Sequence, residues 1–345
     1  MNNDWKNVYP EVPQSFHEAV QRTLDTQIIN KTERKKVMKK RFPIALAAVI
    51  TALGVTTAAA AYVIQWNSKI AERFGANEQK QSELVSAGAL APVDQTVTVN
   101  GLTVTALQTL GDKNGIYMLF DVKAPKGIIL SSDISFGPKV NVEGAKNHIS
   151  TCSGFMDQTG TSSTSGATNE RYYELWLSNG KQEDLNGKTI TVEFAELLAD
   201  NGTIKPDVVL SGPWKLSWKL SYLDNTQTFS INKTYDINGH NVVVNSVELS
   251  PLSMKINLSG DGLKQLIDHS DLDTAGSLLT PTLTLRDGKA FDSYGSYGPG
   301  SEKHTDSTYT LTQNFGKILD VDQVASLNLS FPWEKANNTL TIALP

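Results

Sequence analysis

Residues 99–106 read VNGLTVTA, and residues 237–244 read INGHNVVV. In the first stretch an Asn-Gly pair is followed by alternating apolar and polar side chains, and the second stretch repeats the pair before a run of valines. Asn-Gly favours a two-residue type I′ turn, because both central positions of that turn need a positive φ angle. Each stretch therefore predicts a β-hairpin, and the second copy lies 138 residues after the first.

Further matches share nearly the same offset. The apolar strand at residues 116–120 falls on residues 254–258, and residues 173–185 match residues 309–321 at an offset of 136. We therefore predict a mainly β fold with tandem repeats at residues 93–223 and 224–345. Strands at short spacing indicate that each repeat is a β-sandwich of immunoglobulin-like architecture.

Helical patterns are expected at three places. Residues 65–92, after which the apolar period changes from 3.6 to 2, predict a helical stalk that ends at Ala91-Pro92. Each repeat also carries one predicted helical excursion, at residues 195–200 in the first and residues 262–269 in the second.

Residues 42–64 form an uncharged run of 23 residues. A helix of that length spans about 34 Å, which is enough for the hydrocarbon core of a bilayer. Seven Lys and Arg residues lie just before it, at residues 31–41. By the positive-inside rule we predict a single-pass membrane protein with a cytosolic N-terminus at residues 1–41 and an extracellular remainder. A cleaved signal peptide and a buried soluble helix are the alternatives.

The N-terminal segment is patterned as a short amphipathic helix. Ser15 and Glu18 make an S-x-x-E capping box at its start. The apolar stripe that follows is Phe16, Val20, Leu24 and Ile28. Because this segment is too short to bury the stripe by itself, we expect it to bind a cytosolic partner or the inner leaflet. The alternative is a loosely ordered leader whose basic residues only set the topology.

Composition excludes several classes of function. The net charge is −5, with +4 on residues 1–41 and −9 on the rest, so the predicted outer part has no basic surface for nucleic acid. A single cysteine, Cys152, excludes an internal disulfide framework and a cysteine-paired zinc site. No nucleophile elbow, phosphate loop or H-E-x-x-H motif is present. We therefore predict no enzyme activity, no catalytic residues, no cofactor and no metal.

Two loops are candidates for binding in the predicted outer part. Residues 150–169 are rich in Ser, Thr and Gly, and residues 291–300 place Tyr294 and Tyr297 among Gly and Ser. Tyrosines flanked by small residues make an adaptable contact surface. A flexible connection is the alternative. The acidic run at residues 268–273 is interpreted as a solvated helix end, and a calcium site is the alternative.

Several short motifs along the chain occur together in one known group of proteins. They are residues 12–16 (VPQSF), the basic run to Arg41, the uncharged run, 66–69 (WNSK), 99–104 (VNGLTV), 116–120 (IYMLF) and 214–216 (WKL). With these motifs the chain resembles a family of Gram-positive bacterial membrane proteins defined mainly by a domain of unknown function. Members are often encoded beside extracytoplasmic-function sigma factors, and a second immunoglobulin-like module commonly follows. The resemblance implies an anti-sigma or accessory signalling role.

Two functions follow as hypotheses. The first is a transmembrane envelope-signalling regulator whose N-terminal helix binds a sigma factor or another cytosolic regulator. The alternative is a cell-envelope binding or adhesion module that contacts a wall polymer or an envelope protein, without cytosolic signalling. An extracellular hydrolase is a third and weaker hypothesis.

Overall fold

The computed structural model describes residues 66–145, 149–156, 168–180, 183–237, 239–269, 278–291, 300–331 and 339–344. All of these residues belong to one compact unit. The predicted span at residues 42–64 and the predicted N-terminal helix lie outside the described residues. Within the described part of the chain, no helix is both long and apolar enough to cross a bilayer.

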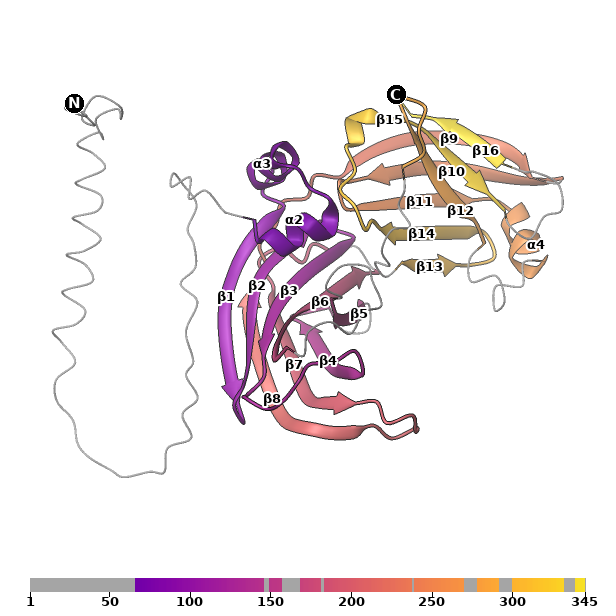
Figure 1. The fold of residues 1–345 in the computed structure, drawn as a ribbon. Helices are drawn as coiled ribbons and strands as arrows, with labels where there is room; N and C mark the ends of the chain where they lie inside the picture. Colours follow the sequence, from indigo (N-terminus) through magenta and orange to yellow (C-terminus); the bar gives the residue numbers. More distant parts are fainter. Residues whose placement is uncertain are drawn as a thin grey trace, which may run out of the picture. The chain divides into compact units, whose positions relative to one another are not determined.

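Repeat 1 consists of two antiparallel sheets (Figure 1). Its strands are β1 (Leu90–Val99), β2 (Leu102–Gly111), β3 (Gly115–Lys123), β4 (Ile134–Val142), β5 (Ile149–Phe155), β6 (Glu170–Asn179), β7 (Thr189–Ala199) and β8 (Asp207–Lys219). One sheet has the order β1-β2-β3-β6-β5 and the other has the order β4-β7-β8. Apolar side chains from both sheets form one shared core.

Repeat 2 has the same topology. Its strands are β9 (Gln227–Ile237), β10 (His240–Leu249), β11 (Ser253–Ser259), β12 (Thr280–Leu285), β13 (Ser301–His304), β14 (Thr308–Asn314), β15 (Val324–Ser330) and β16 (Thr339–Ala343). The sheet orders are β13-β14-β11-β10-β9 and β12-β15-β16, so each strand takes the place of the strand eight earlier. A second, separate core fills this repeat.

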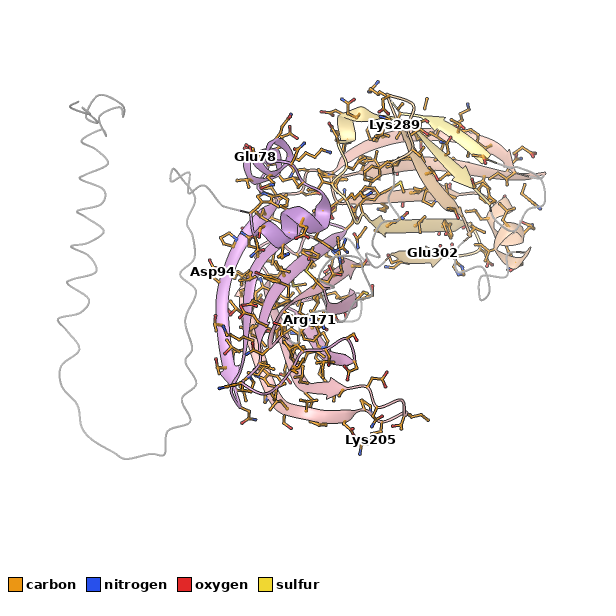
Figure 2. The ribbon with its side chains drawn as sticks, in the orientation of Figure 1. Glu78, Asp94, Arg171, Lys205, Lys289 and Glu302 are labelled. Atoms are coloured by element: carbon orange, nitrogen blue, oxygen red, sulfur yellow. The ribbon has the colours of Figure 1, made fainter. Side chains whose placement is uncertain are left out.

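Details of the backbone also recur at the offset of 138. Asp94 in β1 and Asn232 in β9 are both bulge residues with positive φ angles, 49° and 47° (Figure 2 labels Asp94). Asn100 and Gly101 have φ angles of 49° and 80°, which are the values that a type I′ turn requires. The tandem repeat is therefore present in the fold itself and not only in scattered sequence matches.

The strand order differs from that of an immunoglobulin domain. In that fold the second and third strands lie in different sheets. Here β2 and β3 are paired neighbours, because only residues 112–114 separate them and so short a connection closes a hairpin. The prediction of a mainly β fold is confirmed, whereas the immunoglobulin strand order is not the one observed.

In repeat 1, β8 closes over the free edge of β1. The fully buried Trp214 donates its indole N–H to the carbonyl oxygens of Val99 (3.1 Å) and Leu102 (3.0 Å). The side chain of Asn100 donates to the carbonyl oxygen of Ser211 at 2.8 Å. These contacts join β8 to the end of β1, the turn after it and the start of β2, and so connect the two sheets of repeat 1 at this edge.

Two of the three predicted helical segments need correction. The predicted stalk is two short helices, α2 (Ser68–Phe74) and α3 (Glu78–Ser86), and β1 already begins at Leu90. Gly75 ends α2 with a φ angle of 60°, and Pro92 is tolerated in β1 because that strand lies at a sheet edge. Residues 195–200 fall largely within β7, which pairs on both sides, with β4 and with β8.

The third helical prediction is confirmed. In repeat 2, helix α4 (Gly262–His269) occupies the predicted residues 262–269. Leu263 and Leu266, three residues apart, are buried in the core of this repeat. This spacing is the helical period that the sequence shows.

Candidate functional site: the junction between the repeats

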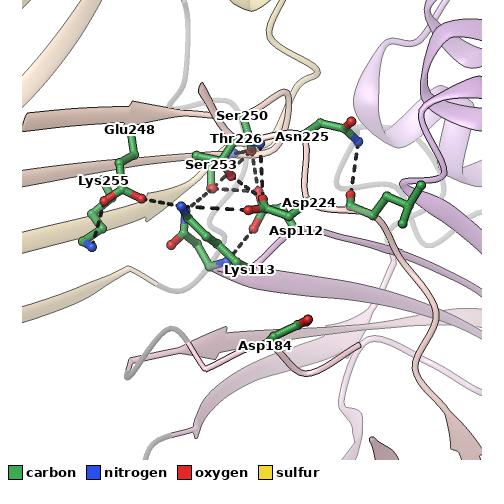
Figure 3. Close-up of polar contacts among 12 residues, drawn as sticks. Asp112, Lys113, Asp184, Asp224, Asn225, Thr226, Glu248, Ser250, Ser253 and Lys255 are labelled. Atoms are coloured by element: carbon green, nitrogen blue, oxygen red, sulfur yellow. Dashed lines mark hydrogen bonds and ion pairs between the residues drawn. The ribbon is translucent and has the colours of Figure 1, made fainter. Parts of the chain in front are cut away.

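Two equivalent turns meet where the repeats join (Figure 3). The β2–β3 turn of repeat 1 is closed by a hydrogen bond from the Asp112 N–H to the Gly115 carbonyl oxygen (3.0 Å). The β10–β11 turn of repeat 2 has the same bond, from Ser250 to Ser253 (2.9 Å). Because Ser250 lies 138 residues after Asp112, the repeats contact each other through the same structural element.

The carboxylate of Asp112 is the centre of this junction. Its Oδ1 accepts hydrogen bonds from the backbone N–H groups of Asn114 (2.7 Å) and Gly115 (2.9 Å) in its own turn. Its Oδ2 accepts from the hydroxyls of Ser250 and, at 2.7 Å, Ser253 across the junction. One side chain therefore caps its own turn and binds the equivalent turn of repeat 2.

The environment of Asp112 disfavours its charged form. The residue is 3% exposed, and burial raises the pKa of its carboxyl group above the usual value. The hydrogen bonds from the two serines and the two backbone N–H groups act in the opposite direction but do not cancel the effect of burial. The junction is thus held by a carboxyl group that is costly to bury and has four donors to offset that cost.

Beside Asp112 lies a chain of three charged side chains (Figure 3). Lys113 Nζ of repeat 1 lies 2.7 Å from Glu248 Oε2 of repeat 2, and Lys255 Nζ lies 3.0 Å from Glu248 Oε1. Burial raises the pKa of the Glu248 carboxyl group, but hydrogen bonds and charges from the two lysines outweigh it. The net pKa is therefore below the usual value. Glu248 is a negative charge shared by two lysines from different repeats.

Replacing Glu248 by glutamine is expected to lower the free energy of unfolding by about 2 kcal/mol at neutral pH, because a carboxylate that lies 2.7 and 3.0 Å from two poorly exposed lysines becomes a neutral amide. The folded-state pKa of Glu248 is depressed, so its contribution is present above the unfolded-state value and is lost as the pH falls through the folded-state pKa. The free energies of unfolding of the wild type and the variant, measured with urea, should therefore become equal at acidic pH. A difference that stayed constant with pH would contradict the ion-pair assignment.

The linker between the repeats is fixed by hydrogen bonds to the segment that precedes β1. The Leu223 N–H donates to the carbonyl oxygen of Gly88 (2.9 Å), and the Asn225 side chain donates to the carbonyl oxygen of Ala87 (3.0 Å). Both acceptors lie in the turn after α3. Residues 223–225, where the sequence predicts the boundary between the repeats, are therefore fixed to the segment preceding β1.

Helices α2 and α3 cover one face of the five-stranded sheet of repeat 1 (Figure 1). Arg73 at the end of α2 forms an ion pair with Glu174 of β6 at 2.8 Å. The side chain of Gln108 in β2 accepts a hydrogen bond from the backbone N–H of Asn67, which caps α2 (2.8 Å). The segment predicted to be a stalk is therefore docked on the sheet.

The same sheet face has opposite chemistry in the two repeats. In repeat 1 it carries the apolar residues Leu110, Tyr117, Leu119 and Trp176, which pack against the helices. At the equivalent positions repeat 2 carries the polar residues Glu248, Lys255, Asn257 and Thr312. The hydrophobic effect explains why α2 and α3 pack on the sheet of repeat 1, because this contact buries the apolar face of the sheet. The polar face of repeat 2 instead provides Glu248 as a partner for Lys113 of repeat 1.

The binding residues predicted from the sequence lie outside the described residues. They are Phe16, Val20, Leu24, Ile28, Tyr294 and Tyr297. Cys152 is described, and its exposed free thiol lies in β5. Among the described residues, no group of three or more His, Cys, Asp or Glu side chains is placed to hold a metal ion.

Sequence reasoning missed the junction residues themselves. Residues 112–115 (DKNG) have the composition of a turn, and the offset of 138 maps them onto residues 250–253 (SPLS). That mapping was the available signal for equivalent turns. It could not show that the turns contact each other, because a repeat in sequence does not specify how its copies pack.

Comparison with known proteins gives a fold but no family. The chain matches no protein-family model and no curated protein. Its fold is similar to the crystal structure of a conserved domain protein from Bacillus anthracis, with a TM-score of 0.53 and 12% sequence identity. The alignment covers 76% of this chain and 94% of that chain. Because 76% of 345 residues exceeds the length of either repeat, the likeness extends beyond one repeat.

A structure of titin A168169 also aligns, with a TM-score of 0.14 and 10% identity over 68% of this chain and 90% of that chain. At that TM-score it supports no statement about the fold. The likeness to the Bacillus anthracis protein shows the fold alone, since the identity is low. The resemblance to a family of Gram-positive membrane proteins stays a prediction.

Proposed function

We propose that this chain is a single-pass membrane protein of the cell envelope that acts as a signalling regulator. In this proposal the two β-repeats lie outside the membrane, and residues 1–41 bind a sigma factor or another cytosolic regulator. The observation that supports it best is the docking of α2 and α3, the first described helices after the predicted span, on the β-repeats.

The packing of α2 and α3 on the β-repeats supports signalling, because a passive spacer between a membrane span and a folded domain does not need to pack on that domain. Ile70 and Phe74 of α2 are 0% and 1% exposed, so α2 is packed as tightly as the cores of the repeats. The first described residue, Trp66, donates its indole N–H to the carbonyl oxygen of Gln81 in α3 (3.1 Å). A change in the β-repeats would thus reach the chain that leads into the predicted span, which is what a transmembrane signal requires.

The proposal assigns the N-terminal stripe to the cytosolic partner. An amphipathic helix that lacks its own core is a common ligand for a hydrophobic groove, where apolar residues three or four positions apart act as anchors. Phe16, Val20, Leu24 and Ile28 have this spacing. The cytosolic segment of a membrane anchor without signalling would need only the basic residues at 31–41, which set the orientation of the span.

The test is a crosslinking pull-down from membranes of the native host. We expect the full chain to recover a cytosolic regulator that is absent when residues 1–30 are deleted. A double substitution in the stripe, Phe16→Asp with Leu24→Asp, should remove the same partner. The matched control is Arg22→Ala with Asp25→Ala, which changes the side of the same predicted helix that faces away from the stripe, keeps the net charge and should leave recovery unchanged.

The alternative function predicts a different outcome. If every version recovers the same envelope proteins and nothing cytosolic, the N-terminal segment only sets topology and the chain is a binding or adhesion module. Substituting Tyr294 and Tyr297 by alanine would then weaken retention of the protein on wall material. A cytosolic partner that is recovered equally well with the stripe variant would overturn the assignment of Phe16 and Leu24.

A further inference from the structure

We propose that α2 and α3 are a clasp that locks the two repeats together, so that release of these helices loosens the junction between the repeats. This inference concerns residues 66–345 only. It holds whether or not the N-terminal segment binds a cytosolic partner.

The clasp is held to repeat 1 by aromatic packing. The ring of Phe74 lies edge-on to Tyr117, with ring centroids 5.0 Å apart, and lies 5.6 Å from the ring of Trp176. Helix α2 has only seven residues, which is too short for a helix to be stable by itself. Its helical state therefore depends on this contact, and losing the contact releases the helix.

The clasp also touches repeat 2. Leu252 and Ile318 of repeat 2 belong to the same apolar cluster as the helices and the sheet of repeat 1. The Ile318 N–H donates to the carbonyl oxygen of Phe74 (3.4 Å), and Lys80 Nζ donates to the carbonyl oxygen of Ile318 (3.3 Å). One pair of helices thus bridges residues that are more than 200 positions apart in sequence.

This third cluster is separate from the cores of the two repeats. Opening the clasp therefore leaves both β-cores intact and removes only the packing around Phe74, Leu252 and Ile318. Leu252 lies in the β10–β11 turn that binds Asp112, so the clasp supports the polar junction directly. A pull on the chain before Trp66 would act first on α2, the element nearest to the predicted span.

The first test is hydrogen exchange of the full chain in detergent, comparing the wild type with Phe74→Ala. We expect exchange in residues 68–86 to become at least about tenfold faster, because removing a buried ring favours local opening. If the helices are a clasp, peptides that contain residues 250–253 and 315–319 of repeat 2 also exchange faster. The strands of the repeat cores should stay protected.

Energetic coupling is reciprocal, and this allows a second test from the other side. Ile318→Ala changes only repeat 2, yet it should speed exchange in α2 and α3. If the helices were a cap on repeat 1 alone, this variant would leave their exchange unchanged. Because Ile318→Ala spares the aromatic cluster, it also tests the clasp if Phe74→Ala proves too destabilising to purify.

The distance between the repeats gives an independent readout. Cys152 is exposed in repeat 1 and is the only cysteine, so adding Thr234→Cys on the exposed side of β9 makes one pair for spin labels. We expect a narrow distance distribution in the wild type and a broader one in Phe74→Ala and Ile318→Ala. The control Ile342→Ala truncates the core of repeat 2 and should leave the distribution narrow.

Two results would overturn the proposal. One is that Phe74→Ala speeds hydrogen exchange in α2 and α3 but changes neither the distance distribution nor the exchange of residues 315–319. The other is equal broadening by Ile342→Ala, because the effect would then reflect a general loss of stability and not release of the clasp.

Discussion

Replacing Asp112 by alanine is expected to lower the free energy of unfolding by about 3 kcal/mol, because four buried donors lose their acceptor. Two of these donors are the hydroxyls of Ser250 and Ser253 in repeat 2. The other two are backbone N–H groups that stabilise the β2–β3 turn. The same substitution should uncouple the repeats, so that one calorimetric transition becomes two.

Asp112→Asn is the matched control for the alanine variant. Its amide oxygen can accept from the two backbone N–H groups, and its amide nitrogen can donate to the serine oxygens. We therefore expect a loss of less than about 1 kcal/mol at neutral pH. A large loss in the asparagine variant would mean that the negative charge itself holds the junction.

The pKa of Asp112 sets the sign of a pH dependence. Burial raises this pKa in the folded state, so the folded protein binds the proton more tightly than the unfolded chain does. The contribution of Asp112 to stability is then greatest at low pH and falls as the pH rises through the folded-state pKa. Urea unfolding at a series of pH values should show that the free energy of unfolding of Asp112→Asn increases relative to that of the wild type as the pH rises.

Replacing Trp214 by alanine is expected to cost about 4 kcal/mol, the usual range for removing a large buried aromatic side chain. Trp214 is fully buried, and its ring lies 5.8 Å from that of Phe136 in the core of repeat 1. Its indole N–H also joins β8 to β1 and β2 through Val99 and Leu102. In the Asp112→Ala background, where the repeats are expected to unfold separately, the loss should appear in the transition of repeat 1, because repeat 2 has its own core.

A pair of phenylalanine variants separates the indole N–H from the ring. Trp214→Phe removes a donor with two carbonyl partners. Trp218→Phe removes a buried indole N–H that has no hydrogen-bond partner among the described residues. We expect Trp214→Phe to cost about 1–2 kcal/mol more than Trp218→Phe in chemical unfolding. Equal costs would show that the two hydrogen bonds do not stabilise the closure of β8 over β1.

The parts of the fold that the sequence predicted correctly depend on local energies. The Asn-Gly turn at residues 100–101 was predictable because few residue pairs adopt two consecutive positive φ angles. The apolar period of α4 and the alternation along β2 also act within a few residues. The offset of 138 between the copies then predicted two repeats, and the structure has two repeats with the same strand order.

The failures have one common cause. The helical prediction at residues 195–200 was wrong because these residues gain ladder hydrogen bonds with β4 and β8, which lie far away in sequence. The stalk prediction likewise treats residues 65–92 as an element separate from the β-repeats. Its apolar residues Ile70 and Phe74 had no visible partner in the sequence, because that partner is a sheet face assembled from β2, β3 and β6.

By itself, the sequence determined that this chain is built from two β-repeats, where the first hairpin of each repeat turns, and that an uncharged run with a basic segment before it precedes them. Tertiary structure alone decided that the two equivalent turns contact each other and that α2 and α3 bridge both repeats. The physical reason is that local conformational preferences act between near neighbours. Asp112 is buried only once the chain has folded. Its four hydrogen-bond donors then include Ser253, which lies 141 residues further along the chain.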